Sequence, residues 1–125
     1  MTARLLIQLA AVFGGLGVAI GAFGAHSLHD MLVKTGRFDT FETAVRYQFY
    51  LALALLAIGV LWAVRPELNS LGLTGWLWAG GIVIFSGSLH TLCFTGLTKM
   101  GAVAPIGGLL FLAGWVSLIL AVREL

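Results

Sequence analysis

Polar side chains inside apolar segments are the part of this sequence that could do chemistry. His26 closes the first apolar stretch within the motif GAFGAHSLHD at residues 21–30, and other polar residues begin the second stretch or lie within the third. Ionisable groups are costly inside a membrane, so such residues are functional candidates by default. The candidate polar pocket consists of His26, Glu42, Arg46, Gln48, Ser86, Ser88 and His90.

These residues allow an ambitious interpretation and a plainer one. His26 and His90 could face inward in the same leaflet and hold a metal or haem, but no carboxylate is fixed beside them. Hydrogen bonds between helices, to serine hydroxyls or backbone carbonyls, are favoured instead. Glu42 and Arg46 stand four residues apart with the acid first, which favours a structural ion pair over substrate binding.

No pattern in the chain predicts catalysis. The sequence shows no nucleophile–base pairing and no phosphate-binding loop. A proton-coupled antiporter would require a carboxylate in the middle of an apolar segment, and none lies there. Cys93 is the single cysteine and lies in an apolar segment, where a thiol usually acts as a small hydrophobe. We therefore expect no enzyme activity, no metal and no cofactor.

The composition places the chain in a lipid bilayer. Of its 125 residues, 60% are hydrophobic and 10% are charged, against about 25% charged in an ordinary soluble domain. The scattered Lys and Arg residues do not form the basic face of a nucleic-acid-binding protein. Four segments are long enough to cross the bilayer as helices of a single domain spanning 1–125: Leu5–Ala25, Thr43–Val64, Leu73–Gly96 and Ala104–Val122.

The first segment also resembles a secretory signal, with a cleavage site at Ala22-Phe23-Gly24 as the alternative. Its apolar run is longer than a typical signal core and its glycines are patterned like a packing face. We expect the segment to be retained as a membrane span.

The connections between the spans predict an all-α, antiparallel, up-down-up-down bundle with both termini on one side. In the longer connection, 26–42, Ser27 with Asp30 resembles a capping pair that opens a short interfacial helix. Asp39 with Glu42 resembles a second pair that opens the next span. The Lys and Arg residues divide three against four between the two faces, which leaves the membrane orientation undecided. An aromatic belt is expected near residues 65–72, from Trp62, Trp76 and Trp78.

Glycines recur at helical spacing and predict close helix packing. In the first span the steps alternate between three and four residues, which keeps one helix face nearly bare. In lipid, helices gain most from close approach of their backbones. Packing within the bundle is favoured, and a homodimer face on the first span is the alternative. The predicted packing positions are Gly14, Gly17, Gly21, Gly24, Gly80, Gly87, Gly107 and Gly114.

Four stretches together resemble one family, the small membrane proteins grouped as domain of unknown function 423, which includes the eukaryotic transmembrane protein 256. The stretches are GAFGAHSL at 21–28, FETAVRYQFYLALALLAIG at 41–59, FSGSLH at 85–90 and APIGGLLFLAGW at 104–115. They stand in the order and spacing of the family, and the resemblance covers nearly the whole chain. The resemblance implies four spans in a bacterial inner membrane, and it implies no activity.

The sequence thus predicts a multi-pass membrane protein that acts through contacts in the bilayer. One hypothesis is an accessory or assembly component of a larger membrane complex, with a membrane-protein partner or a homo-oligomer. The alternative is a binding protein or conduit for a lipid, quinone or small solute, using the pocket near His26, Arg46 and His90.

Overall fold

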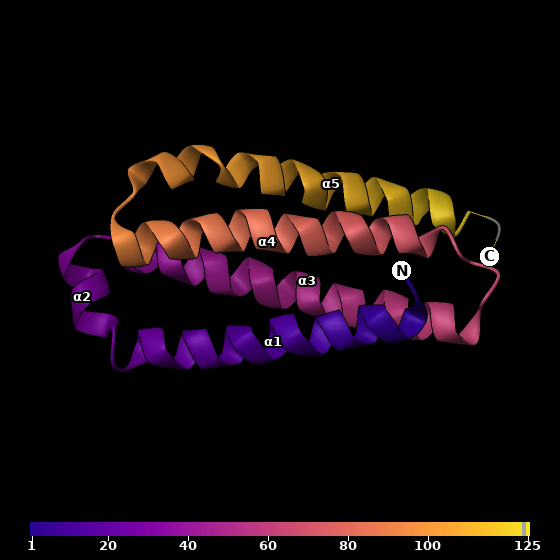
Figure 1. The fold of residues 1–125 in the computed structure, drawn as a ribbon, viewed down its shortest axis with the longest axis horizontal. Coiled ribbons are helices and arrows are strands. Elements are labelled where there is room, and N and C mark those ends of the chain that lie inside the picture. The colour runs from indigo at the N-terminus through magenta and orange to yellow at the C-terminus, as the bar shows by residue number, and fades with distance from the viewer. Residues whose placement is uncertain (124) are drawn as a thin grey trace.

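The computed structural model describes residues 1–123 and 125, and within them the chain is helical without strands. Figure 1 shows the elements in order. They are α1 (Ala3–Ala25), α2 (His29–Lys34), α3 (Phe38–Val64), α4 (Leu71–Thr95), the 3₁₀ helix η1 (Thr98–Ala102) and α5 (Ala104–Ala121).

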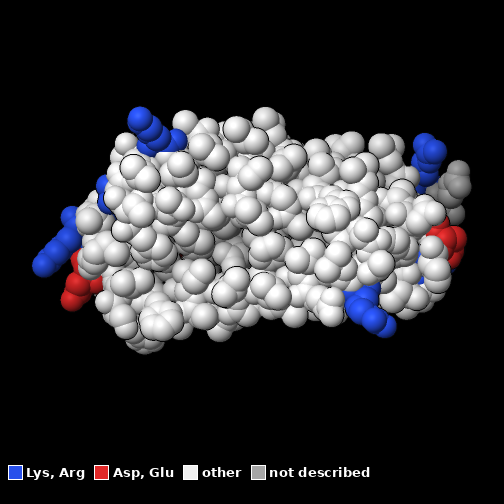
Figure 2. Space-filling model, in the orientation of Figure 1, with Lys and Arg blue, Asp and Glu red and all other residues white. Residues whose placement is uncertain are grey.

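Among the described residues, four helical stretches are long and apolar enough to cross a membrane, which confirms the predicted class. On the face drawn in Figure 2, charged side chains gather toward the two ends of the molecule and leave a charge-free band between them. At one end, the loop after α3 pairs Arg65 with Glu67. Hydrogen bonds from its own backbone and from Arg65 hold the pKa of the Glu67 carboxyl below its usual value.

The long helices lie side by side in a row. α1 packs on α3, α3 on α4 and α4 on α5, whereas α1 meets α4 through few residues, chiefly the buried Leu6, which a Cβ at Gly75 would approach to 2.2 Å. Both chain ends lie at one end of the row and α2 lies at the other (Figure 1). The row is more open than the compact bundle that the short loops predicted. α1 and α5 form its outer edges, and each keeps one broad face free of other helices.

The glycine face of α1 is occupied by α3. A Cβ added at Gly24 would lie 2.0 Å from the Phe41 ring, and one at Gly21 would lie 3.3 Å from Val45. Gly14 lies further along the same face, where a Cβ would lie 3.9 Å from Ala52. The missing side chains therefore let α3 approach, and a second copy could not use this face.

Glycines of α5 let α4 approach closely, through its backbone at one position and an indole ring at another. A Cβ at Gly107 would lie 2.4 Å from the backbone nitrogen of Phe85, and one at Gly114 would lie 2.3 Å from Trp78. Trp78 is fully buried and its indole Nε1–H donates to the carbonyl of Phe111 at 3.2 Å. Its assignment to an aromatic belt was wrong, because the space above Gly114 takes its ring into the core.

Two of the predicted packing glycines lie outside close helix contacts. A Cβ at Gly87 would meet nothing within 4 Å, and one at Gly80 would reach Leu110 only at 3.8 Å. The seven-residue step that suggested them does not follow the face of α4 that meets α5. That face instead carries Gly81, where a Cβ would lie 2.6 Å from the Phe111 ring.

The connection between α1 and α3 folds against the end of the row. Leu32 of α2 is fully buried in a cluster with Phe41 and Cys93. The predicted caps are absent: α2 begins after Leu28 and α3 after Arg37, and neither residue makes a side-chain cap. α3 thus starts five residues before the predicted Thr43, because apolar contacts, rather than caps, fix this end.

Candidate functional site

Gln48 of α3 is a buried polar residue whose side chain bonds to two other helices of the row. Its side-chain Nε2 donates to the backbone carbonyl of Phe13 in α1 at 2.9 Å, and its Oε1 lies 3.1 Å from Nε2 of His90 in α4. Gln48 is 4% exposed. One buried amide therefore connects three helices at membrane depth.

Gly17 makes the contact between Gln48 and α1 sterically possible. In an α-helix the carbonyl of residue i faces the turn that carries residue i+4, and Gly17 holds that position relative to Phe13. A Cβ at Gly17 would lie 3.7 Å from Nε2 of Gln48 and 3.7 Å from the Phe49 ring. A methyl group fits there, whereas a larger side chain would displace the amide.

The hydrogen bonds also assign the protonation of His90. Since the Gln48 amide nitrogen is directed at Phe13, its oxygen faces His90, and the imidazole must donate from Nε2–H. Nδ1 is then an acceptor, and it is buried without a partner among the described residues. The ring lies edge-on to Phe41 and stacks on Phe94. This aromatic surrounding suits a neutral imidazole.

The two serines of the candidate pocket bind backbone carbonyls. Ser86 Oγ donates to the carbonyl of Ala44 in α3 at 2.8 Å, and it connects α4 to α3 one turn from the His90–Gln48 bond. Ser88 Oγ donates to Phe85 within its own helix. The hydroxyls therefore bond to backbone carbonyls and support packing.

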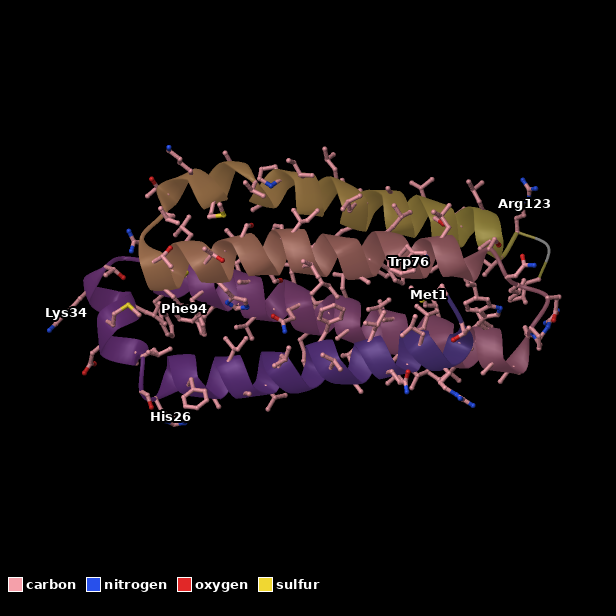
Figure 3. All side chains as sticks on the ribbon, in the orientation of Figure 1. Met1, His26, Lys34, Trp76, Phe94 and Arg123 are labelled. Atoms are coloured by element: carbon pink, nitrogen blue, oxygen red, sulfur yellow. The ribbon has the colours of Figure 1, made fainter. Side chains whose placement is uncertain are left out.

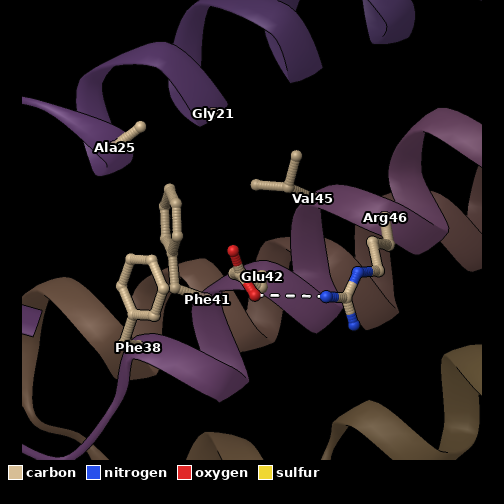
Figure 4. Close-up of a pocket in the computed structure, with 7 residues that line it drawn as sticks. All are labelled: Gly21, Ala25, Phe38, Phe41, Glu42, Val45 and Arg46. Atoms are coloured by element: carbon tan, nitrogen blue, oxygen red, sulfur yellow. Dashed lines mark hydrogen bonds and ion pairs between the residues drawn. The ribbon is translucent and has the colours of Figure 1, made fainter. Parts of the chain in front are cut away.

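Glu42 and Arg46 lie outside this buried network, in a groove between α1 and α3 (Figure 4). Their side chains form an ion pair with 3.1 Å between Arg46 Nη2 and Glu42 Oε2, and both are well exposed. The groove holds about 140 Å³ and is otherwise lined by Gly21, Ala25, Phe38, Phe41 and Val45. It has room for a small group at the end of the span.

His26 lies apart from both places. It ends α1 on the outer side of the row, and its side chain points away from the other helices (Figure 3). It borders a shallow groove of about 290 Å³ with Ala19, Ala22, Phe23 and Ser27. The predicted pocket is therefore divided into three separate places, and His26 and His90 do not meet. Among the described residues, no three His, Cys, Asp or Glu side chains come together.

Two features of the site were missed from the sequence. Thr74 of α4 is fully buried and its Oγ1 lies 2.8 Å from Ser117 Oγ in α5. A groove of about 390 Å³ also lies between α3 and α5. It is lined mainly by apolar and aromatic side chains: Thr43, Tyr47, Leu51, Phe85, Gly108, Phe111, Leu112 and Trp115. The sequence signal for the Thr74–Ser117 pair is a hydroxyl residue within each of two apolar spans, which needs a hydrogen-bond partner there.

Comparison with known proteins places the chain among membrane proteins without an established role. It is 43% identical to a UPF0382 membrane protein of Staphylococcus haemolyticus, over 94% of each chain. It is 36% identical to the UPF0382 membrane protein YwdK of Bacillus subtilis, over 94% of this chain and 95% of that one. No solved structure matches the chain. The model of the family described as "Protein of unknown function (DUF423)" matches residues 20–108, and the chain belongs to this family.

Proposed function

We propose that the chain is a non-enzymatic, multi-pass protein of the bacterial inner membrane that acts by binding another membrane protein, as an accessory or assembly component. The spans run up-down-up-down across the bilayer, both termini lie on one side, and α2 rests at the opposite interface. This role goes beyond the known properties of the relatives, which are named only as membrane proteins.

The observation that carries the proposal is the difference between the two edge helices. The outer face of α5 exposes large aliphatic side chains such as Leu109 and Ile119, which suit lipid. The outer face of α1 exposes a stripe of small residues, including Ala11, Gly15 and Ala19, which is flanked by the exposed Val12 and Phe23. Interfaces between membrane helices are enriched in small residues because these let backbones approach. We therefore assign the partner to the outer face of α1.

Site-specific photocrosslinking in native membranes tests this role. A benzophenone amino acid at Ala19 should give a discrete protein adduct, whereas the same group at Leu109 of α5 should react with lipid. Both positions are exposed on edge helices, so Leu109 is the matched control. Absence of any protein adduct from Ala19 would contradict the proposal.

The groove between α3 and α5 favours a second function, the binding of a lipid, quinone or similar small molecule. Its volume of about 390 Å³ falls within the range of about 300–1,000 Å³ found for ligand pockets. Tyr47 stacks on Phe111 along its wall. This groove replaces the pocket near His26, Arg46 and His90 as the place for such a ligand, because those residues do not share one cavity. Native mass spectrometry should then detect a bound molecule that is lost in Trp115→Ala and retained in Trp76→Ala.

A further inference from the structure

Gln8 is an exposed polar side chain on the outer face of α1 that makes no side-chain hydrogen bond with the described residues. Gln8 lies one helical turn after Arg4 in α1. It is therefore about 6 Å deeper in the membrane than Arg4. Gln48 shows the contrasting case, since its amide is buried and bonded on both sides. In hydrocarbon, an unbonded amide is costly.

A stripe of small residues beside Gln8, bordered by the exposed Val12 and Phe23, would let another helix approach closely. Ala11, Gly15, Ala19 and Ala22 follow Gln8 at steps of three and four residues, and all are exposed. A Cβ added at Gly15 would meet nothing within 4 Å, so no element of the chain occupies this part of the face. The face therefore combines an unbonded amide with room for a neighbouring backbone.

We propose that the outer face of α1 binds the same face of a second copy of this chain, with the two Gln8 amides hydrogen-bonded across the interface. This proposal rests on the proposed function and names its partner. A carboxamide both donates and accepts, so it complements an identical group across a two-fold axis. Each copy then satisfies the amide that its own fold leaves unbonded.

The amide also selects the relative orientation of the two copies. In a parallel pair, Gln8 meets Gln8 at the same depth. In an inverted pair centred on Gly15, Gln8 would meet the level of Ala22, seven residues beyond the centre, where the side chain offers no hydrogen bond. Arg4 lies on the same face nearer the membrane surface, where its long side chain reaches water and its repulsion is screened.

Disulfide crosslinking in native membranes tests the interface. In a Cys93→Ser background, single cysteines at Ala11 or Ala19 should give disulfide-linked dimers on mild oxidation. A cysteine at Leu109, equally exposed but on α5, should give none. Adding Gln8→Leu should lower the dimer yield about three- to tenfold, the range expected from one or two hydrogen bonds in a membrane, and Gln8→Asn should restore part of it.

The outcomes separate this proposal from the broader one. No crosslink at Ala11 or Ala19, or a yield that Gln8→Leu leaves unchanged, overturns the dimer. If those cysteines fail while the photocrosslinker at Ala19 captures a different protein, the proposed function stands and the second copy is excluded. An unaltered unfolding midpoint for Gln8→Leu in dilute detergent establishes that the variant still folds.

Discussion

At the scale of single residues, the polar side chains of this protein are connectors between helices. Gln48 joins α1 and α4 through Phe13 and His90, and Ser86 joins α4 to α3. Each bond satisfies a group that the bilayer could not hydrate. The arrangement favours a structural role for His90, whose imidazole is held by Gln48.

Replacing Gln48 by leucine should therefore destabilise the folded row. Two hydrogen bonds are lost and the carbonyl of Phe13 keeps only its bond within the helix. Hydrogen bonds between membrane helices contribute about 0.6 kcal/mol on average and up to about 1.7 kcal/mol, so we expect a loss of about 1–3 kcal/mol. Reversible unfolding in mixed detergent micelles measures it. Gln8→Leu is the control, and an equal loss there would contradict the assignment.

Glycine substitutions should separate close contacts from open positions. Alanine at Gly107 brings a Cβ against the backbone of Phe85, which cannot rotate away, whereas alanine at Gly87 meets open space. Overpacking costs typically about 1–3 kcal/mol, while an exposed helical Gly→Ala change gains up to about 1 kcal/mol. Thermal or detergent unfolding should rank Gly107→Ala well below Gly87→Ala. Equal stability of the two variants would show that α4 and α5 pack differently.

At the scale of elements, sequence reasoning located the helices better than it located their faces. Length and hydropathy identify a span whatever surrounds it, and the bounds of α1, α4 and α5 lie within two residues of the prediction. In a bilayer, however, lipid is as apolar as the protein core, so hydrophobic periodicity no longer distinguishes a buried face from an exposed one.

The errors follow from this loss of contrast. Trp78 was placed in the aromatic belt and proves to be core, while Trp76, two residues away, is exposed. Gly87 was placed in a packing face and meets no neighbour. The glycines of α1 were easier to read, since five small residues at regular steps left one narrow face that could receive α3. The sequence could not predict which polar groups meet, because a pairing such as His90 with Gln48 depends on how both helices are rotated about their axes.

Apolar contacts hold α2 against the end of the row. Substituting each of two adjacent residues, one buried and one exposed, tests this. Leu32 is fully buried against the end of the row, whereas its neighbour Val33 is 53% exposed. Leu32→Ala should cost about 2–5 kcal/mol of local packing and speed amide hydrogen exchange through residues 28–37. Val33→Ala should leave the exchange unchanged. Similar exchange in both variants would mean that α2 is not docked on the row.

At the scale of the whole molecule, an open row has a consequence that a closed bundle lacks. Its two edges are chemically different: α5 exposes mainly large apolar groups, whereas α1 exposes a stripe of small residues and an amide between larger apolar side chains. Lipid can cover the first at little cost, but it cannot hydrogen-bond the second. This asymmetry supports both the proposed partner role and the proposed dimer.

The proposed parallel pair forms only between copies that enter the membrane in the same orientation, so the orientation of the copies bears on it. The charge distribution does not choose the orientation, but accessibility can reveal it. In a Cys93→Ser background, cysteines at Thr2 and Asn69 should react with an impermeant maleimide from one side of the membrane. Cysteines at Thr35 and Lys99 should react from the other side, because the loops alternate between the ends of the row (Figure 1). If every site reacts from both sides, the copies insert in both orientations and only like-oriented copies can form the parallel Gln8 contact. If Asn69 and Lys99 react from the same side, the row does not cross the bilayer as proposed.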